Sequence, residues 1–416
     1  MTTIPQAQRG HCRFCNNPLT DCFVDLGMSP LCESFLRPED LNAAESFYPL
    51  TAFVCSKCHL VQLQEYVAPD NIFDDYAYFS SFSESWLRHA ARYCEMVTER
   101  FSLGKDSFVV EIASNDGYLL QNFVKANIPA LGIEPAANVA EAAKDNGVES
   151  LVAFFGRETA QRVRDERGPA NVIAGNNVLA HVPDINDFVG GLKILLADDG
   201  VVTMEFPHLW RLMEGNQYDT IYHEHFSYLS FTTTRRIFLE HGLELFDVEE
   251  LPSHGGSLRI FAQHKGHSRP VSEAAQDLLA REREAGFEDL AHYLSFTPQV
   301  ERTKRRLLSF LIDAREQGKS VAGYGAPGKG NTLLNYCGIR TDLLEYTVDK
   351  NPYKHGRFCP GTHIPIFSPE KLQETRPDFI LILPWNLKRE ILDQLSYARE
   401  WGARFVVPIP ELEIID

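Results

Sequence analysis

The sequence has no uninterrupted apolar run of about 18 residues, the length that a membrane-spanning helix needs. Residues 1–10 also lack the apolar segment of a secretion signal. Basic residues are few, with 40 lysines and arginines against 57 aspartates and glutamates, and the net charge is -17. Proteins that bind nucleic acid through its phosphates need a basic surface. These absences predict a cytoplasmic protein with neither a nucleic-acid nor a membrane partner.

Cysteine is scarce in most of the chain, because seven of the nine cysteines lie within the first 94 residues. An odd number of cysteines in a long chain argues against a disulfide framework. The early cysteines include two Cys-x-x-Cys pairs, formed by Cys12, Cys15, Cys55 and Cys58. Two such pairs can present four thiolates to one zinc ion, which a redox pair would not require. Four sulfurs complete the coordination, so we predict a structural zinc, with His11 and His59 as non-ligands.

Residues 70–82 are rich in aromatic and acidic side chains, among them Tyr76. Such a segment suits a lid over a pocket, and it suits an interdomain packing surface equally well. A helical pattern over residues 85–101 follows and leads into the next domain.

Residues 108–120 read as a buried strand, a turn of small residues and a helix, the first unit of a doubly wound α/β sheet. The turn runs Glu111-x-Ala113-x-Asn115-x-Gly117. It resembles motif I of the class I S-adenosylmethionine-dependent methyltransferases, with Ala113 and Asn115 replacing two glycines. The resemblance implies that these four residues line the cofactor.

Further strands follow in the order expected of that fold. The strand over 130–134 ends in Glu134, where this family binds the ribose hydroxyls, and a carboxylate can accept both protons. The strand over 171–177 ends at Asn177, which would also face the cofactor, and another strand covers 200–207.

A second glycine-rich turn lies late in the chain, where Gly323, Gly325 and Gly328 match Gly-x-Gly-x-x-Gly. Asp349 follows about 20 residues later, as in dinucleotide-binding folds. Gly330 occupies the Ser/Thr position of a P-loop, so the hydroxyl that would bind magnesium is missing. We therefore predict a C-terminal Rossmann-like α/β domain.

Three domains result: a zinc-binding domain over 1–75, a methyltransferase domain over 76–270 and the Rossmann-like domain over 271–416. A charged helical connector covers 272–317.

Residues 221–228, which we name the acid/base strip, read Ile-Tyr-His-Glu-His-Phe-Ser-Tyr. On a strand, Tyr222, Glu224 and Phe226 would face one way and His223 and His225 the other, whereas on a helix or an irregular loop the grouping would differ. Almost every side chain in the strip can hold or move a proton, which suits a catalytic site. The alternative is that these residues are hydrogen-bonded parts of the core or of an interface, with no role in catalysis. Because the strip lacks the His-Glu-x-x-His spacing of a helical zinc site, we interpret it as metal-free acid/base machinery.

Two classes of enzyme remain. If the C-terminal glycines hold NAD, the protein is a dehydrogenase of a nucleotide sugar; if the middle domain holds S-adenosylmethionine, it is a methyltransferase that needs no NAD. The acid/base strip directly follows the strands of the middle domain, which favours the methyltransferase. A protein that binds a ligand without catalysing a reaction is a third option, but it would have no use for the proton-transferring side chains of the strip.

The paired cysteines, the Tyr-His-Glu-His-Phe segment and the late Gly-Tyr-Gly-Ala turn together resemble the three-domain sugar C-methyltransferases over essentially the whole chain. The greatest similarity is to sugar C-3 methyltransferases of deoxysugar and antibiotic biosynthesis, of the tetronitrose and kijanose type. The resemblance implies a dTDP-linked 3-amino-2,3,6-trideoxy-4-keto hexose as substrate, S-adenosylmethionine as methyl donor and a new methyl group at C-3.

The same resemblance suggests residue roles. His225 would be the base, with Glu224 orienting it or the substrate amine. Tyr222 and His181 would hydrogen-bond the C-4 oxygen, and Tyr76 would close the pocket. For the C-terminal turn, we expect Gly325, Lys329 and Asn331 to face the nucleotide or its diphosphate and Asp349 to lie near the nucleoside. A monomer is the expected state.

Overall fold

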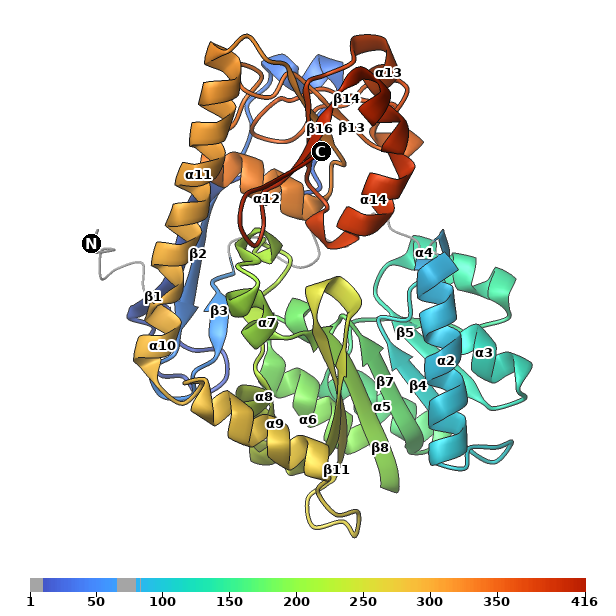
Figure 1. Ribbon diagram of the computed structural model, residues 1–416. Helices are drawn as coiled ribbons and strands as arrows, with labels where there is room; N and C mark the ends of the chain where they lie inside the picture. Colours follow the sequence, from blue (N-terminus) through green and yellow to red (C-terminus); the bar gives the residue numbers. More distant parts are fainter. Residues whose placement is uncertain (1–9, 66–79, 83) are drawn as a thin grey trace.

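The computed structural model describes residues 10–65, 80–82 and 84–416, and these residues form three sheets (Figure 1). The sheets have four, seven and six strands. The predicted α/β fold with a zinc-binding segment, a central class I methyltransferase sheet and a C-terminal α/β sheet is confirmed.

The seven-stranded sheet has the order β10-β11-β8-β7-β4-β5-β6, and its central strands are parallel. Strand β11 is antiparallel to both neighbours, which gives the strand arrangement of class I methyltransferases. The strands are β4 (Val109–Ile112), β5 (Ala130–Glu134), β6 (Ser150–Val152), β7 (Ala170–Asn176), β8 (Leu196–Pro207), β10 (Leu243–Leu251) and β11 (Ser257–His264). Strand β4 is buried along its whole length, as expected for a parallel strand covered on both faces.

Helices pack around this sheet (Figure 1). They are α2 (Glu84–Arg100), α3 (Leu120–Lys125), α4 (Ala137–Ala143), α5 (Arg157–Arg167), α6 (Ile185–Leu195) and α8 (Phe231–Glu240). Helix α7 (Leu209–Glu214) follows β8 and packs into the core of the N-terminal and C-terminal sheets. The helix predicted over residues 85–101 corresponds to α2.

The N-terminal sheet has the order β1-β2-β3-β9 and takes its last strand from the acid/base strip. Strands β1 (Asp21–Ser29), β2 (Tyr48–Val54) and β3 (Val61–Leu63) precede the methyltransferase sheet in sequence, whereas β9 (Ser227–Tyr228) follows most of it. Val61 pairs with Tyr228 and Gln62 with Ser227. The zinc-binding segment therefore holds one end of the strip by backbone pairing.

The C-terminal sheet has the order β14-β13-β12-β15-β16-β17, with only β17 antiparallel. Its strands are β12 (Val321–Tyr324), β13 (Thr347–Val348), β14 (Ile366–Phe367), β15 (Phe379–Ile382), β16 (Arg404–Val407) and β17 (Glu413–Ile415). The helices α12 (Gly328–Cys337), α13 (Lys371–Thr375) and α14 (Lys388–Gln394) belong to the same domain. Helix α12 begins directly after the glycine-rich turn, as a Rossmann-like unit requires.

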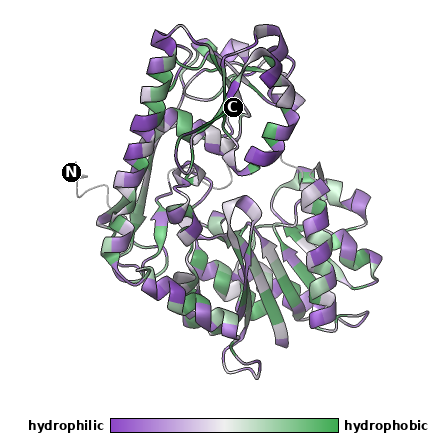
Figure 2. Ribbon diagram, in the orientation of Figure 1, coloured by the Kyte–Doolittle hydropathy of each residue, from purple (hydrophilic) through white to green (hydrophobic). Residues whose placement is uncertain are grey.

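The N-terminal and C-terminal sheets share one hydrophobic core. Phe23 and Leu50 belong to the same buried cluster as Leu333 and Val406. Figure 2 shows hydrophobic residues concentrated in the strands of the central sheet and hydrophilic residues along much of the long helix α11 (Phe296–Glu316). Of the helices in the described part of the chain, none has the length and apolar character needed to cross a bilayer.

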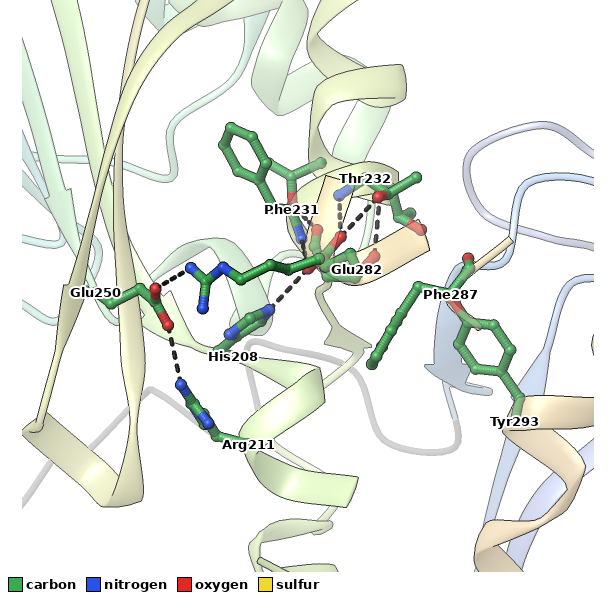
Figure 3. Close-up of polar contacts among 12 residues, drawn as sticks. His208, Arg211, Phe231, Thr232, Glu250, Glu282, Phe287 and Tyr293 are labelled. Atoms are coloured by element: carbon green, nitrogen blue, oxygen red, sulfur yellow. Dashed lines mark hydrogen bonds and ion pairs between the residues drawn. The ribbon is translucent and has the colours of Figure 1, made fainter. Parts of the chain in front are cut away.

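The predicted connector consists of α9 (Glu273–Glu284), α10 (Leu290–Leu294) and α11. Figure 3 shows how α9 is fixed to the methyltransferase domain through Glu282, whose side chain is fully buried. The carboxylate accepts hydrogen bonds from the backbone N–H groups of Phe231 and Thr232, each at 2.7 Å. His208 Nε2 lies 2.7 Å from Glu282 Oε1, the oxygen that also accepts from Phe231. The start of α8 is thereby tied to the connector.

Candidate active site

The four predicted zinc ligands come together where β2 leads into β3. The sulfurs of Cys12, Cys15, Cys55 and Cys58 all lie within 4.8 Å of one another. The Cys12–Cys58 and Cys15–Cys55 sulfur distances are 3.6 and 3.5 Å, close to the about 3.8 Å edge of a tetrahedron with Zn–S bonds of about 2.3 Å. The set fits a structural zinc ion. Neither His11 nor His59 belongs to it, and the His59 ring stacks on Tyr293.

The turn after β4 follows the path of a glycine-rich turn although two glycines are replaced. Ala113, Asn115 and Gly117 have φ values of 55, 51 and 75°, all in the left-handed region. Glycine adopts this conformation freely and asparagine tolerates it, whereas alanine is disfavoured by about 1–2 kcal/mol. The two replacements therefore stand at positions where the backbone favours glycine.

Two acids at the carboxyl ends of β4 and β5 face this turn. Glu134 accepts hydrogen bonds from the backbone N–H groups of Asn115 and Ala136, both at 2.9 Å, so its carboxylate is fixed. Glu111 is fully buried, and within the described residues neither of its carboxylate oxygens has a hydrogen-bond partner. Burial raises the pKa of Glu111 well above its ordinary value. The Tyr118 side chain opposes only part of this rise, and a buried carboxyl group with so little support fits a site for a polar ligand such as S-adenosylmethionine.

The chain before α2 closes over the same turn. The backbone N–H of Ser80 donates to Asn115 Oδ1 at 2.9 Å, and that of Ser81 donates to Asp116 Oδ2 at 3.1 Å. This end of the aromatic segment 70–82 therefore contacts the turn after β4. The predicted site residue Tyr76 lies outside the described residues.

Asn177 directly follows β7 and has a left-handed conformation, with a φ of 55°. Its backbone N–H donates to Glu205 O at 2.7 Å, and its Nδ2 lies 3.2 Å from His254 Nε2. The amide is thus held beside the loop that joins β10 and β11.

The acid/base strip forms a turn before it enters β9. The His225 N–H donates to Tyr222 O at 2.9 Å, and the two rings have centroids 4.1 Å apart. His223 points elsewhere, with Nε2 3.2 Å from Pro49 O. The strip therefore takes the irregular-loop alternative and not the strand grouping, because the turn brings the rings of Tyr222 and His225 together.

His181 completes a cluster of rings around His225. The two imidazole centroids lie 4.5 Å apart at an interplanar angle of 78°. Burial lowers the pKa of His181 to about 4, opposed by a hydrogen bond to the backbone of Glu224. Burial also lowers the pKa of His225 well below its ordinary value, and the charge of His181 lowers it further. Both imidazoles are therefore neutral at neutral pH.

Glu224 faces the N-terminal domain, with Oε2 3.5 Å from the Sγ of Cys32. Burial raises the pKa of Glu224 to about 7, while hydrogen bonds from its own backbone and from Cys32 oppose that shift. The carboxyl can therefore exchange a proton near neutral pH.

Gly325 and Asp349 hold the shape of the C-terminal turn. Gly325 has a φ of 86°, and a Cβ there would lie 2.6 Å from Pro384. Asp349 accepts hydrogen bonds from the N–H groups of Ala326 at 2.7 Å and Asn351 at 2.8 Å.

The side chains of Lys329 and Asn331 leave this turn in different directions. Lys329 Nζ donates to Asn386 Oδ1 at 2.8 Å. Asn331 is buried, and its Nδ2 donates to Cys32 O at 2.6 Å. A Cβ at Gly328 would lie 2.7 Å from the Cys32 sulfur, so the start of α12 packs closely against the N-terminal domain.

Comparisons with known proteins agree with this arrangement. Three family models match along the chain: "Putative zinc binding domain" over 12–73, "Methyltransferase domain" over 86–248 and "C-methyltransferase C-terminal domain" over 252–410. The C-methyltransferase NovU of Streptomyces niveus is 37% identical over 404 residues, which cover 97% of this chain and 96% of that protein. The chain belongs to this C-methyltransferase family.

Other similarities of the C-methyltransferase are confined to part of the chain. A ubiquinone biosynthesis O-methyltransferase of Rhodopseudomonas palustris is 24% identical over 23% of this chain and 38% of its own. A crystal structure of a SAM-dependent methyltransferase from Anabaena variabilis has a TM-score of 0.36 at 16% identity, covering 42% of this chain and 85% of its own. The family assignment makes the protein a methyltransferase that uses S-adenosylmethionine, and the dehydrogenase alternative is not favoured.

The sequence analysis missed one buried charged network of this C-methyltransferase. Glu205, at the end of β8, accepts hydrogen bonds from Arg259 at 2.8 Å and Ser253 at 2.9 Å, and His89 Nε2 lies 2.9 Å away. Burial opposes ionisation, but the His89 hydrogen bond and the Arg259 charge hold the pKa of Glu205 below its ordinary value. Arg259 is directly opposite Glu205 on β11, a pairing that depends on strand register and has no local signal.

Proposed function

We propose that this C-methyltransferase adds a methyl group to C-3 of a dTDP-linked 3-amino-2,3,6-trideoxy-4-keto hexose, as in deoxysugar biosynthesis. The observation that carries the proposal is the convergence of the Tyr222, His225 and His181 rings into one cluster, in which His225 is buried and the other two are half-buried. Methylation at a carbon beside a ketone requires removal of a weakly acidic proton and stabilisation of the resulting enolate oxygen. The cluster offers both a base and neutral donors.

His225 is the proposed base. Its Nδ1 lies 3.2 Å from Thr220 O, a carbonyl that can only accept, so Nδ1 carries the proton and Nε2 is free to take one. Because its pKa is lowered by burial, the imidazole needs no deprotonation before it acts. S-adenosylmethionine, when bound, supplies the electrophilic methyl group.

The remaining residues of the cluster orient the sugar. We assign Tyr222 and His181 to the C-4 oxygen, Glu224 to His225 or the substrate amine, and Tyr76 to the closure of the pocket. Glu111, Ala113, Asn115, Gly117, Glu134 and Asn177 are the proposed contacts to S-adenosylmethionine. Holding the donor and the sugar together supplies much of the rate, because the reaction becomes effectively unimolecular.

The nucleotide is assigned to the C-terminal domain, with Gly325, Lys329 and Asn331 toward the nucleotide or its diphosphate and Asp349 toward the nucleoside. The proximity of the start of α12 to Cys32, a neighbour of Glu224, supports a substrate that extends from the strip to this turn.

A substrate panel tests the proposal. The protein is incubated with methyl-labelled S-adenosylmethionine and dTDP-4-keto sugars that differ at C-3, and the products are analysed by mass spectrometry. We expect label in the 3-amino-4-keto sugar at C-3. Label on oxygen or nitrogen, or turnover that requires NAD, would contradict the proposal.

The base assignment has its own test. His225→Asn should retain S-adenosylmethionine binding but lose methyl transfer and the exchange of deuterium at C-3 of the substrate, because His225 Nε2 is the proposed acceptor of that proton. We expect a loss of about 10²–10⁴-fold in kcat. His223→Asn is a matched control, since His223 faces Pro49; near-normal turnover by His225→Asn would remove it as the base.

A further inference from the structure

Helix α12 of the C-terminal domain packs against the segment that leads into the acid/base strip. That segment is the short helix η6 (Tyr218–Thr220). Thr332 Oγ1 donates to Ile221 O at 3.3 Å, which joins α12 to the first residue of the strip. Figure 1 shows α12 next to this part of the chain, between the upper and lower halves of the molecule. The two domains therefore meet directly beside the catalytic cluster.

Trp385 joins two charged groups at this contact. Its Nε1–H donates to Asp219 Oδ2 at 2.7 Å, and the Lys329 ammonium lies 4.8 Å from the centre of its ring. Both are favourable positions for the indole, which is a donor at its N–H and negative on its face. Gly255 bounds the ring from the methyltransferase domain, where a Cβ would lie 2.9 Å from Trp385 Cη2. The ring is thus held between the domains.

The Lys329 ammonium has unused donors. An ammonium group offers three hydrogen-bond donors, and Asn386 Oδ1 takes one of them. Among the described residues, no carboxylate oxygen lies within 4.0 Å of Lys329 Nζ. A half-buried ammonium without a directly paired carboxylate is suited to an anionic ligand.

The positive charge of Lys329 affects two histidines of the methyltransferase domain. Besides burial, which is the main cause, Lys329 lowers the pKa of His254, and it contributes to the lowered pKa of His225. Burial lowers the pKa of Lys329 itself, and Asp219 raises it. Burial raises the pKa of Asp219 to about 7, while the charge of Lys329 and the hydrogen bond from Trp385 oppose the rise. The phenol of Tyr218 and the thiol of Cys337, whose own pKa values are raised by burial, lie near the same carboxylate.

We propose that Lys329 binds an anionic oxygen of the substrate beside the acid/base strip, and that Asp219, acting through Trp385, is a positioning residue that keeps this ammonium charged and in place. The oxygen is either the enolate oxygen that forms at C-4 or a phosphate oxygen of the nucleotide. The inference rests on the proposed function and adds Asp219 and Trp385 to its machinery.

Kinetics of Lys329→Met, which removes the charge, and Lys329→Arg, which keeps it, test the first part. An enolate contact predicts a fall in kcat of about 10²-fold, with slower deuterium exchange at C-3 and little change in KM. A phosphate contact predicts a rise in KM of about tenfold or more, with exchange retained at saturating substrate. Lys329→Arg should recover part of either loss. Near wild-type kcat and KM in Lys329→Met overturn the proposal.

The pH profile tests the role of Asp219. Asp219→Asn removes a negative charge, so the pKa of Lys329 should fall and the alkaline limb of kcat/KM should move down by about one pH unit. Arginine stays protonated over this pH range, so the double variant Asp219→Asn/Lys329→Arg should not show the shift of the alkaline limb. A limb that stays at the wild-type pH in Asp219→Asn, or a shift that persists in the double variant, overturns the role of Asp219.

Controls separate this inference from the proposed function. Lys319→Met removes a surface lysine that pairs with Asp378 at 2.8 Å in the same domain, and it should leave kinetics and pH profile unchanged. Calorimetric binding of S-adenosylmethionine shows that each variant is folded. The proposed function requires that the wild type turns over in the same assay. If the wild type does so and the Lys329 and Asp219 variants have unchanged kinetics and pH profiles, only the inference on Lys329 and Asp219 is overturned.

Discussion

At the scale of the residue, burial makes Glu224 a carboxyl group that titrates near neutral pH. Its pKa is raised to about 7, first by burial and in part by the nearby charge of Glu33. A carboxylic acid with a raised pKa is protonated below that value and ionised above it. If the ionised form orients His225 or the substrate amine, methyl transfer should depend on pH through this group.

This dependence gives a prediction for Glu224→Gln. The wild type should lose kcat/KM as the pH falls through about 7, because Glu224 then becomes neutral. In Glu224→Gln the rate should be lower at pH 8 and the limb near pH 7 should be absent. The measurement is kcat/KM from pH 5.5 to 9. A variant that keeps the same acid limb would assign that limb to another group.

At the scale of the element, the connector helix α9 is anchored by one buried carboxylate. Glu282 caps the start of α8, where two backbone N–H groups and the Thr232 hydroxyl donate to it (Figure 3). His208 lies against the same carboxylate and is itself buried. A negative charge at a helix N-terminus is favourable, and here it also fixes the path of the chain toward the C-terminal domain.

Glu282→Ala should therefore destabilise the protein strongly. It leaves the donors at the start of α8 and His208 without their acceptor, and removal of one partner of a buried pair costs about 3–5 kcal/mol. Chemical denaturation measures the change in the free energy of unfolding. Glu284→Ala, at an exposed position two residues further along α9, is the matched control and should change stability by less than about 0.5 kcal/mol. Equal effects of the two variants would contradict the capping role.

At the scale of the whole molecule, the zinc-binding segment supports the acid/base strip, which lies outside that segment. Cys55 and Cys58 lie between β2 and β3, and β3 pairs with β9 at the end of the strip. The same N-terminal sheet shares its core with the C-terminal domain. Loss of the metal should therefore reach the active site through backbone pairing.

Cys55→Ser should lose zinc and most of the methyl transfer, although Cys55 is not assigned to the substrate or the cofactor. Metal content by mass spectrometry and turnover are measured on the same preparation. Cys22→Ser is the control, because Cys22 is a free cysteine outside the four-sulfur set and should retain both. Full activity in a zinc-free Cys55→Ser protein would show that the metal does not support the strip.

Much of this arrangement could be predicted from local patterns. The helix over 85–101, the strand ending in Glu134 and the glycine-rich turn before α12 have the expected extents, because periodicity and turn residues act over a few positions. The sequence left open how the side chains of the strip are grouped, since a turn and the pairing with β3 decide the orientation of Tyr222 and His225. The network around Glu205 was missed because it depends on register between strands.

The sequence by itself determined the secondary-structure elements, the four sulfur ligands and the family, because these depend on residue spacing and on motifs. Only the tertiary structure decided that the strip closes the sheet of the zinc-binding segment. It also decided that Asp219 and Trp385, 166 positions apart in the chain, meet next to Lys329. Such contacts arise when separate segments bury a common apolar surface, and no local pattern encodes them.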